Sequence, residues 1–136
     1  MGRTTIARDT VVRGGSVNPS TRTPIGALWF YALDRPLTGA VEVSDTVLLD
    51  STNAAVHVYG SSVKNLHLRN VRIDRAGTFG LQVQANGGLT VTDVKATRLG
   101  AAGVYICRSA NTFRIVGRAT GLATRYCGPF PPPRQR

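Results

Sequence analysis

Two sets of side chains in this sequence are suited to binding sugars. When the repeating units of the chain are aligned, an indole, an imidazole, an amide and a phenol share one position, and they belong to Trp29, His57, Gln82 and Tyr105. Two residues further along, the aligned position holds Tyr31, Tyr59, Gln84 and Cys107. Flat aromatic rings stack on sugar rings, while amides and imidazoles form hydrogen bonds with hydroxyl groups. The pattern therefore predicts a surface that contacts carbohydrate.

The segment after the first of these aromatic runs adds a carboxylate and a guanidinium, from Asp34 and Arg35. They could contact a sugar hydroxyl, or form a local salt bridge worth about 0–1 kcal/mol if exposed. The candidate substrate-binding residues are thus Trp29, Tyr31, Asp34, Arg35, His57, Tyr59, Gln82, Gln84 and Tyr105. The competing interpretation is that outward aromatic residues simply favour strands, or that a loop or a neighbouring chain covers them.

A repeat positions these side chains. Its units open at Val41, Leu66, Leu89 and Phe113, at spacings of 25, 23 and 24 residues, which are typical of a solenoid. Apolar and polar residues alternate within each unit, and this is the two-residue period of a half-buried strand. We expect three short strands per unit, which in the second unit are residues 66–68, 71–73 and 80–84.

Residues that tolerate a left-handed backbone recur after each opening strand and predict a sharp corner. They are Asp45, Asn70, Asp93 and Gly117. Four apolar columns should point inward: Val41, Leu66, Leu89 and Phe113; Val43, Leu68, Val91 and Ile115; Leu28, Val56, Leu81 and Val104; and Phe30, Val58, Val83 and Ile106. We therefore predict an all-β fold, a right-handed parallel β-helix (a pectin-lyase-like solenoid) of about four to five rungs.

Residues 1–128 are predicted to form one partial β-helix domain, and residues 129–136 a Pro- and Arg-rich tail that is extended or disordered. The first rung should be irregular, with Ile6, Val11 and Val12 in its strands. A solenoid needs a cap at each end, and nothing at the start of this sequence resembles one. We expect missing upstream rungs or another chain to complete the N-terminal edge.

The chain is strongly basic, with 17 Lys and Arg residues against 7 Asp and Glu residues and a net charge of +10. Such a surface can attract nucleic acid, acidic lipid or acidic polysaccharide. The arginines are scattered without a dense run and without a nucleic-acid motif. The sequence therefore does not favour nucleic acid as the partner, and binding to another polyanion stays an open hypothesis.

Several features are absent or undecided. No apolar run reaches the ~20 residues that span a membrane, so no membrane partner is expected. The first residues lead into no signal region, so the localisation stays open. His57 and His67 fall on different faces, and no shared metal site is predicted. Cys107 and Cys127 either stay thiols or close a disulfide loop of about 20 residues, worth ~3 kcal/mol in the chain-entropy model.

Two carboxylates, those of Asp50 and Asp74, align one unit apart. At the ~4.8 Å spacing of neighbouring strands, two carboxylates would raise the pKa of one of them. The alternative is that both are corner residues that point into solvent.

Four segments of the chain carry a family resemblance. They are RGGSVNPSTRTPIGALWFYALDRPLTG, LLDSTNAAVHVYGSS, AGTFGLQVQANGG and AAGVYICRS. Over residues 10–112 the chain resembles the C-terminal part of the catalytic β-helix of glycoside hydrolase family 87, which contains mycodextranases and α-1,3-glucanases. The resemblance implies a secreted, extracellular enzyme that hydrolyses α-1,3-linked glucan with inversion and needs no organic cofactor.

The resemblance also implies catalysis by three aspartates that include an adjacent pair, and inverting hydrolysis needs carboxyl groups about 6.5–9.5 Å apart. This sequence contains no Asp-Asp pair, so no catalytic residue is assigned and enzymatic activity stays undecided. The first hypothesis is a truncated fragment that binds α-glucan through its outward sheet and lacks the catalytic aspartates. The alternative is a noncatalytic β-helix module that binds polysaccharide or a partner chain.

Overall fold

The structure is a computed structural model that describes residues 4–17, 24–31, 41–59, 65–84, 89–107 and 113–126. Every regular element in these ranges is a β-strand, and the ranges include no helix long and apolar enough to cross a membrane. Residues 129–136, where the tail is expected, lie outside them. The prediction of an all-β chain is confirmed.

Two parallel sheets make up most of the fold. The first sheet contains β1 (Thr4–Ala7), β2 (Thr10–Val12), β6 (Val41–Ser51), β8 (Leu66–Ala76), β10 (Leu89–Leu99), β12 (Phe113–Ile115) and β13 (Ala119–Thr120). The second sheet contains β5 (Leu28–Tyr31), β7 (Val56–Tyr59), β9 (Phe79–Gln84), β11 (Ala102–Cys107) and β14 (Thr124–Tyr126). A short antiparallel pair joins β3 (Ser16–Val17) and β4 (Pro24–Ile25).

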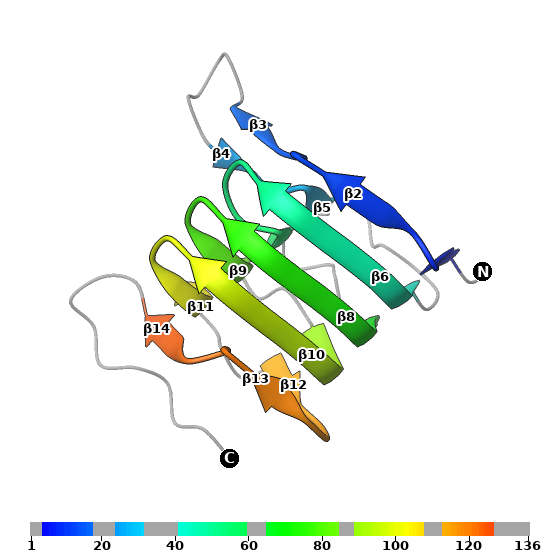
Figure 1. The fold of residues 1–136 in the computed structure, drawn as a ribbon. Coiled ribbons are helices and arrows are strands. Elements are labelled where there is room, and N and C mark those ends of the chain that lie inside the picture. The colour runs from blue at the N-terminus through cyan, green and yellow to red at the C-terminus, as the bar shows by residue number, and fades with distance from the viewer. Residues whose placement is uncertain are drawn as a thin grey trace.

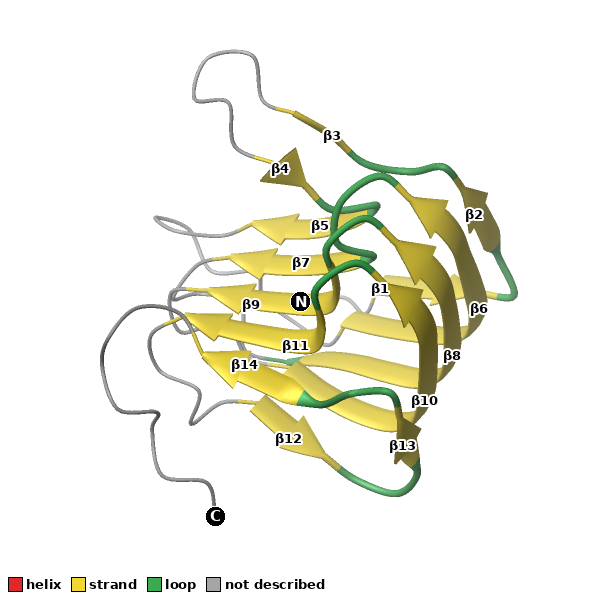
Figure 2. Cartoon of the chain, turned by 60° about the vertical axis from the view of Figure 1, so that its left-hand side comes forward, coloured by secondary structure: helices red, strands yellow, loops and turns green. Residues whose placement is uncertain are grey.

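The chain visits the two sheets alternately. Each long strand of the first sheet is followed by a short strand of the second, and strands of successive units lie side by side in parallel (Figure 1). Figure 2 shows the strands of the second sheet stacked beside the bent strands of the first. We call one passage through both sheets a rung. Sequence units 23 to 25 residues apart are therefore neighbours in space.

The register of the four predicted inward columns is confirmed. In the first sheet Val41 pairs with Leu66 and Leu66 with Leu89, and the second-sheet columns match in the same way. The middle members of all four columns are fully or almost fully buried between the sheets. Each buried aliphatic side chain contributes roughly 1.5–3 kcal/mol relative to an exposed one, so these columns form the core.

The predicted corners are also confirmed. The φ angles of Asp45, Asn70, Asp93 and Gly117 are 51°, 53°, 54° and 82°. In this region Asn and Asp are tolerated better than most side chains because they can form local hydrogen bonds. Here the amide of Asn70 donates to Asp45 Oδ1 at 2.6 Å, which links the corners of two neighbouring strands.

The structure differs from the prediction of two separate short strands on either side of this corner. In β6, β8 and β10 a single strand of 11 residues continues through it. Each strand has a second left-handed residue near its end, and these are Asp50, Arg75 and Arg98. Arginine rarely adopts this conformation, so its identity gave no signal for a corner.

The alignment of Asp50 with Asp74 that the sequence predicts is wrong, and of the two residues only Asp50 lies at a corner. Asp74 pairs in register with Leu49, and Asp50 lies one residue further along, at the second corner. Each carboxylate instead faces an arginine of the next strand, with 3.3 Å from Asp50 Oδ1 to Arg75 Nε and 2.8 Å from Asp74 Oδ1 to Arg98 Nε. Neither therefore faces the other.

The passage from the first sheet to the second requires small residues. A Cβ atom added at Gly100 would collide with the carbonyl oxygen of Gly77, and one added at Gly77 would collide with the carbonyl oxygen of Thr52. Glycine thus allows successive rungs to pack at strand spacing at this corner.

The end rungs are less well buried than the middle ones. The predicted irregular first rung exists: β1 and β2 both pair with β6, and Ile6 and Val11 are half-buried while Val12 is exposed. At the other end Ile115 is 45% exposed, although its register partner Val91 is fully buried. The core columns are thus covered on both sides only in the middle of the stack.

Candidate functional site

The outward face of the second sheet brings together six of the nine residues that the sequence predicts to bind sugar. The pairing of β5, β7, β9 and β11 places both predicted outward columns in register, as aligned from the sequence. We call this surface the aromatic–amide face and define it by Trp29, His57, Tyr59, Phe79, Gln82, Gln84 and Tyr105. Of the other candidates, Tyr31 is described only for its backbone, and Asp34 and Arg35 lie outside the described residues.

His57 lies at the centre of this face but is only 3% exposed, whereas the sequence predicts an exposed imidazole. The Trp29 ring stacks on it with centroids 6.5 Å apart, and the Tyr59 ring meets it edge-on at 6.2 Å. Behind it, a Cβ atom at Gly26 would lie 2.8 Å from His57 Cβ, so this glycine makes room for the side chain. His57 is therefore a buried imidazole with an aromatic ring on either side of it.

Hydrogen bonds fix the central amides. His57 Nε2 lies 2.6 Å from Gln84 Oε1, and Gln82 Nε2 donates to the same oxygen at 3.1 Å. Since Gln84 Oε1 can only accept, His57 Nε2 carries the hydrogen. Burial lowers the pKa of His57 below its ordinary value, and the bond to Gln84 opposes this only in part. His57 is thus a neutral imidazole whose Nδ1 atom is buried without a hydrogen-bond partner among the described residues.

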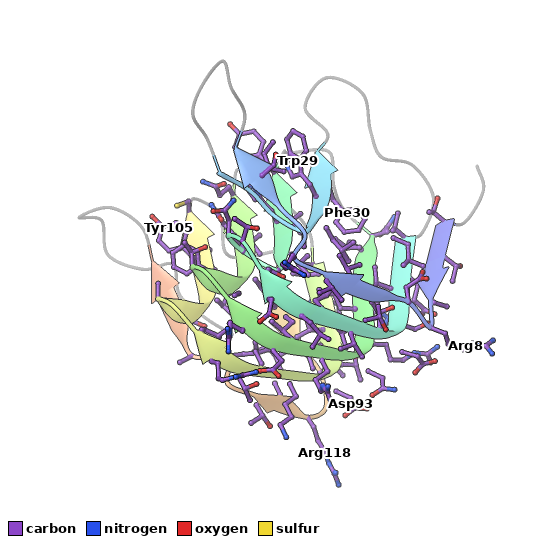
Figure 3. The ribbon with its side chains drawn as sticks, turned by 45° about the horizontal axis from the view of Figure 1, so that its top comes forward. Arg8, Trp29, Phe30, Asp93, Tyr105 and Arg118 are labelled. Atoms are coloured by element: carbon purple, nitrogen blue, oxygen red, sulfur yellow. The ribbon has the colours of Figure 1, made fainter. Side chains whose placement is uncertain are left out.

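A second ring pair lies further along the face. Phe79 and Tyr105 stack in parallel with centroids 4.3 Å apart and planes 5° from parallel. Phe79 is not among the predicted site residues, because the predicted strand begins at Gly80 and because the two-residue period places Phe79 on the inward side with Leu81. Only the contact with Tyr105 shows that its ring belongs to the face. Trp29 and Tyr105 are both visible in Figure 3, on strands β5 and β11.

The carboxylates lie elsewhere. Among the described residues they occur only between β1 and β2 and on β6, β8 and β10, at Asp9, Glu42, Asp45, Asp50, Asp74 and Asp93. Hydrogen bonds from Arg98, and then from Thr97, lower the pKa of Asp74 to about 2. None of these groups lies on the aromatic–amide face.

The other histidine belongs to the first sheet. His67 Nε2 lies 2.9 Å from Thr92 Oγ1 and His67 Nδ1 lies 3.9 Å from Glu42 Oε2, so the two histidines are on different sheets. No group of three potential metal ligands occurs among His, Cys, Asp and Glu in the part of the chain that the structure describes.

The end of the outward column is covalently held. Cys107 is disulfide-bonded. Of the two states that the sequence leaves open for this residue, a free thiol or a disulfide, the structure has the disulfide. The sequence contains two cysteines, and the other, Cys127, lies outside the described residues.

Comparisons with known proteins give one informative similarity. No protein-family model matches the chain, and no curated protein matches it significantly. Among solved structures, it is similar to the catalytic unit of the thermostable GH87 α-1,3-glucanase from Streptomyces thermodiastaticus strain HF3-3, with a TM-score of 0.78 and 31% sequence identity. The similarity covers 90% of this chain and 25% of the glucanase chain. The predicted resemblance is confirmed, and this chain has the fold of part of a glycoside hydrolase family 87 catalytic unit.

Proposed function

We propose that the chain is a partial right-handed parallel β-helix, and that its aromatic–amide face binds α-1,3-linked glucan without hydrolysing it. The fold is supported by the parallel register of units 23 to 25 residues apart and by the alternation between two sheets. The ligand class is supported by the similarity to a glucanase catalytic unit, of which this chain spans a quarter.

The observation that carries the proposal is the exposed indole of Trp29, which is 43% accessible although it stacks on a buried imidazole. Large hydrophobic side chains with this exposure mark binding surfaces when they belong to a wider patch. Phe79 and Tyr105 supply a second ring pair up to three strands away, at about 14 Å for a strand spacing of ~4.8 Å. The face therefore offers two aromatic platforms to one oligosaccharide.

Polar groups between the platforms supply the hydrogen bonds. The two bonds that Gln84 Oε1 accepts fix the orientation of this amide. The Nε2 atom of Gln84 donates to no group in the described part of the chain, so its two N–H bonds remain for sugar hydroxyls. A preorganised amide of this kind loses little conformational entropy on binding.

The chemistry of the face argues against hydrolysis. Inverting glycosidases need two carboxyl groups about 6.5–9.5 Å apart, one of them an acid with a raised pKa. The described strands β5, β7, β9, β11 and β14 contain no Asp or Glu. On the first sheet, the hydrogen bond from Arg98 lowers the pKa of Asp74 and keeps this carboxylate ionised. A general acid has to be protonated before the reaction, so Asp74 does not suit that role. Binding without cleavage is the outcome that these residues support.

The proposal is tested by sedimentation of the purified chain with insoluble α-1,3-glucan, with reducing sugar measured in the same tubes. We expect the wild type to sediment with the glucan, Trp29→Ala to stay in solution, and no sugar to be released. Val12→Ala is the matched control, because Val12 is also exposed but lies on the first sheet. Equal sedimentation of Trp29→Ala and wild type would contradict the binding site, and released sugar would contradict the absence of hydrolysis.

A further inference from the structure

Two cations lie directly beside each other on the outward side of the first sheet. Arg72 on β8 pairs in register with Lys95 on β10, and both side chains are exposed. At the other outward pairs of these two strands, a threonine of β10 lies beside His67, Arg69 or Asp74 of β8. Like charges directly opposite one another destabilise a sheet. We call Arg72 and Lys95 the cation pair, and it costs stability in the free protein.

A carboxylate on the same strand does not neutralise the cation pair. Asp74 Oδ1 accepts from Arg98 Nε at 2.8 Å and from Thr97 at 3.0 Å, and Asp74 Oδ2 accepts from Arg98 Nη2 at 2.9 Å. Among the groups that lower the pKa of Asp74, Arg72 contributes least. Within the described ranges, neither cation of the pair forms an ion pair or a hydrogen bond through its side chain.

The second corner of the same strands shows a different arrangement of charge. Each guanidinium there faces a carboxylate of the preceding strand, with Asp50 beside Arg75 at 3.3 Å and Asp74 beside Arg98 at 2.8 Å. The preceding strand instead places Val47 beside the cation pair, and an aliphatic side chain cannot balance charge. The positive charge of the pair is therefore available to an anion from outside the chain.

The surroundings of the pair favour a sugar polymer over a nucleic acid. Thr97 is exposed on β10, and Thr120 of β13 pairs in register with Lys95, so hydroxyl groups lie near the cations. Strands β2, β6, β8, β10 and β13 contain no Phe, Tyr or Trp, so this face offers no ring on which the bases of a single strand could stack. It also presents no helix to enter the groove of a duplex.

We propose that Arg72 and Lys95 bind an acidic polysaccharide, with one anionic group of the polymer between the two cations and with Thr97 and Thr120 facing its hydroxyl groups. A guanidinium binds such a group through two parallel N–H bonds, and an ammonium binds it as a point charge. The anionic group is a carboxylate or a sulfate, since both have this chemistry.

The cation pair belongs to β8 and β10 of the first sheet, which lie side by side in Figure 1, whereas the aromatic–amide face belongs to the second sheet. The inference therefore does not depend on the binding of α-glucan. A chain with both faces occupied would join a neutral glucan to an acidic polysaccharide.

The proposal is tested by fluorescence anisotropy of three labelled probes with the full chain. The probes are oligogalacturonate, which carries carboxylates, a sulfated dextran oligosaccharide and a neutral dextran oligosaccharide. We expect saturable binding of at least one anionic probe at low salt and none of the neutral probe. Binding should be lost at high salt, because salt screens exposed charges. Comparison of the two anionic probes identifies the anionic group that the pair prefers.

A double variant, Arg72→Gln with Lys95→Gln, should weaken this binding roughly tenfold, because each exposed charge contact contributes up to about a factor of five. The matched control is Arg8→Gln with Arg114→Gln. It removes the same net charge from two other exposed positions, and Figure 3 shows Arg8 projecting away from the ribbon. We expect the control to change the affinity by about twofold at most. Circular dichroism checks that each variant is folded.

The single variant Lys95→Gln tests the repulsion within the pair without any ligand. It should raise the Tm of the free chain at low salt by roughly 1–4 °C, because it removes one of two opposed like charges. The difference should disappear at high salt. Saturation with the bound probe should raise the Tm of the wild type, since the probe binds only the folded chain.

Four results would overturn the proposal. A folded wild type that binds neither anionic probe has no such site. Equal weakening in the two double variants would assign binding to net charge rather than to the cation pair. A DNA duplex that binds through Arg72 and Lys95 when neither oligosaccharide does would make nucleic acid the ligand. A lower Tm for Lys95→Gln at low salt would contradict the repulsion from which the inference starts.

Discussion

The Nε2 atom of His57 lies 2.6 Å from the Oε1 atom of Gln84, on the neighbouring strand of the second sheet. This bond connects the two outward columns of the aromatic–amide face diagonally. Because the Trp29 ring stacks on the same imidazole, His57 links the aromatic platform to the amides. The face is therefore one connected unit rather than a set of independent side chains.

The buried imidazole should make stability depend on pH. Burial lowers the pKa of His57 below its ordinary value of 6.5, so the unfolded chain takes up this proton more readily than the folded chain. The free energy of unfolding should therefore fall as pH decreases below about 6.5. Urea unfolding at pH 7.5 and pH 5 measures this, and His57→Asn should remove the difference.

His67→Asn is the control for this measurement, because His67 lies on the first sheet and contacts Thr92 instead. It should keep the loss of stability seen in the wild type. A wild type and a His57→Asn variant with the same pH dependence would show that His57 is not the titrating group.

Removing the hydrogen-bond acceptor at Gln84 should lower the free energy of unfolding more than removing the hydrogen-bond donor at Gln82. Gln84→Ala leaves the buried Nε2–H of His57 without a partner, and such a group costs about 1–3 kcal/mol of the free energy of unfolding. Gln82→Ala removes one half-buried donor and leaves His57 paired, so we expect a loss below ~1 kcal/mol. Denaturant unfolding of both variants provides the comparison, and equal losses would contradict the role given to the His57 bond.

Asp74 should stabilise the fold down to low pH. Its pKa is lowered from 3.8 to about 2, chiefly by Arg98. The ionised carboxylate therefore contributes stability above about pH 4, and this contribution is lost as pH falls through 2. Asp74→Asn should be less stable than the wild type at pH 6 and should approach it near pH 2. Urea unfolding at these two pH values measures the difference.

Asp9→Asn is the matched control for Asp74, because Asp9 is exposed between two strands of the same sheet and forms no ion pair among the described residues. We expect it to match the wild type at both pH values. An Asp74→Asn variant that kept a constant difference from the wild type between pH 6 and pH 2 would argue against the Arg98 pair.

The middle of the stack should be more sensitive to truncation than its end. Leu68 is fully buried between rungs, so Leu68→Ala should cost about 2–5 kcal/mol through lost contacts and a cavity. Ile115 belongs to the same column but is 45% exposed, so Ile115→Ala should cost less than ~1 kcal/mol. Thermal unfolding of the two variants measures the difference, and similar losses would contradict the observed burial.

Much of the fold follows from local sequence pattern. The two-residue alternation and the spacing of the units are sufficient to align Val43 with Leu68 and Val58 with Val83, because a slip by one residue would turn every apolar side chain outward. The first corner was predictable for the same local reason, since Asp and Asn at that position tolerate positive φ.

The rest depends on contacts between rungs. Arg75 adopts a left-handed backbone beside the carboxylate of Asp50, a partner that lies in the preceding unit of the sequence. His57 occupies an outward position of its strand but is only 3% exposed, and the rings of Trp29 and Tyr59 lie against it. Such tertiary contacts leave no periodic signal in the sequence. The outward positions of the site residues were therefore predictable, but the burial of His57 was not.

Trp29 allows the central claim to be measured directly, because it is the sole tryptophan of the chain. The measurement is a titration of intrinsic tryptophan fluorescence with soluble α-1,3-gluco-oligosaccharides. We predict a saturable change in emission, and about fivefold weaker binding for Gln84→Ala, as expected for the loss of one hydrogen bond. An emission spectrum that stays constant across the titration, in a protein whose circular dichroism shows folded strands, would contradict binding of α-1,3-glucan at this face.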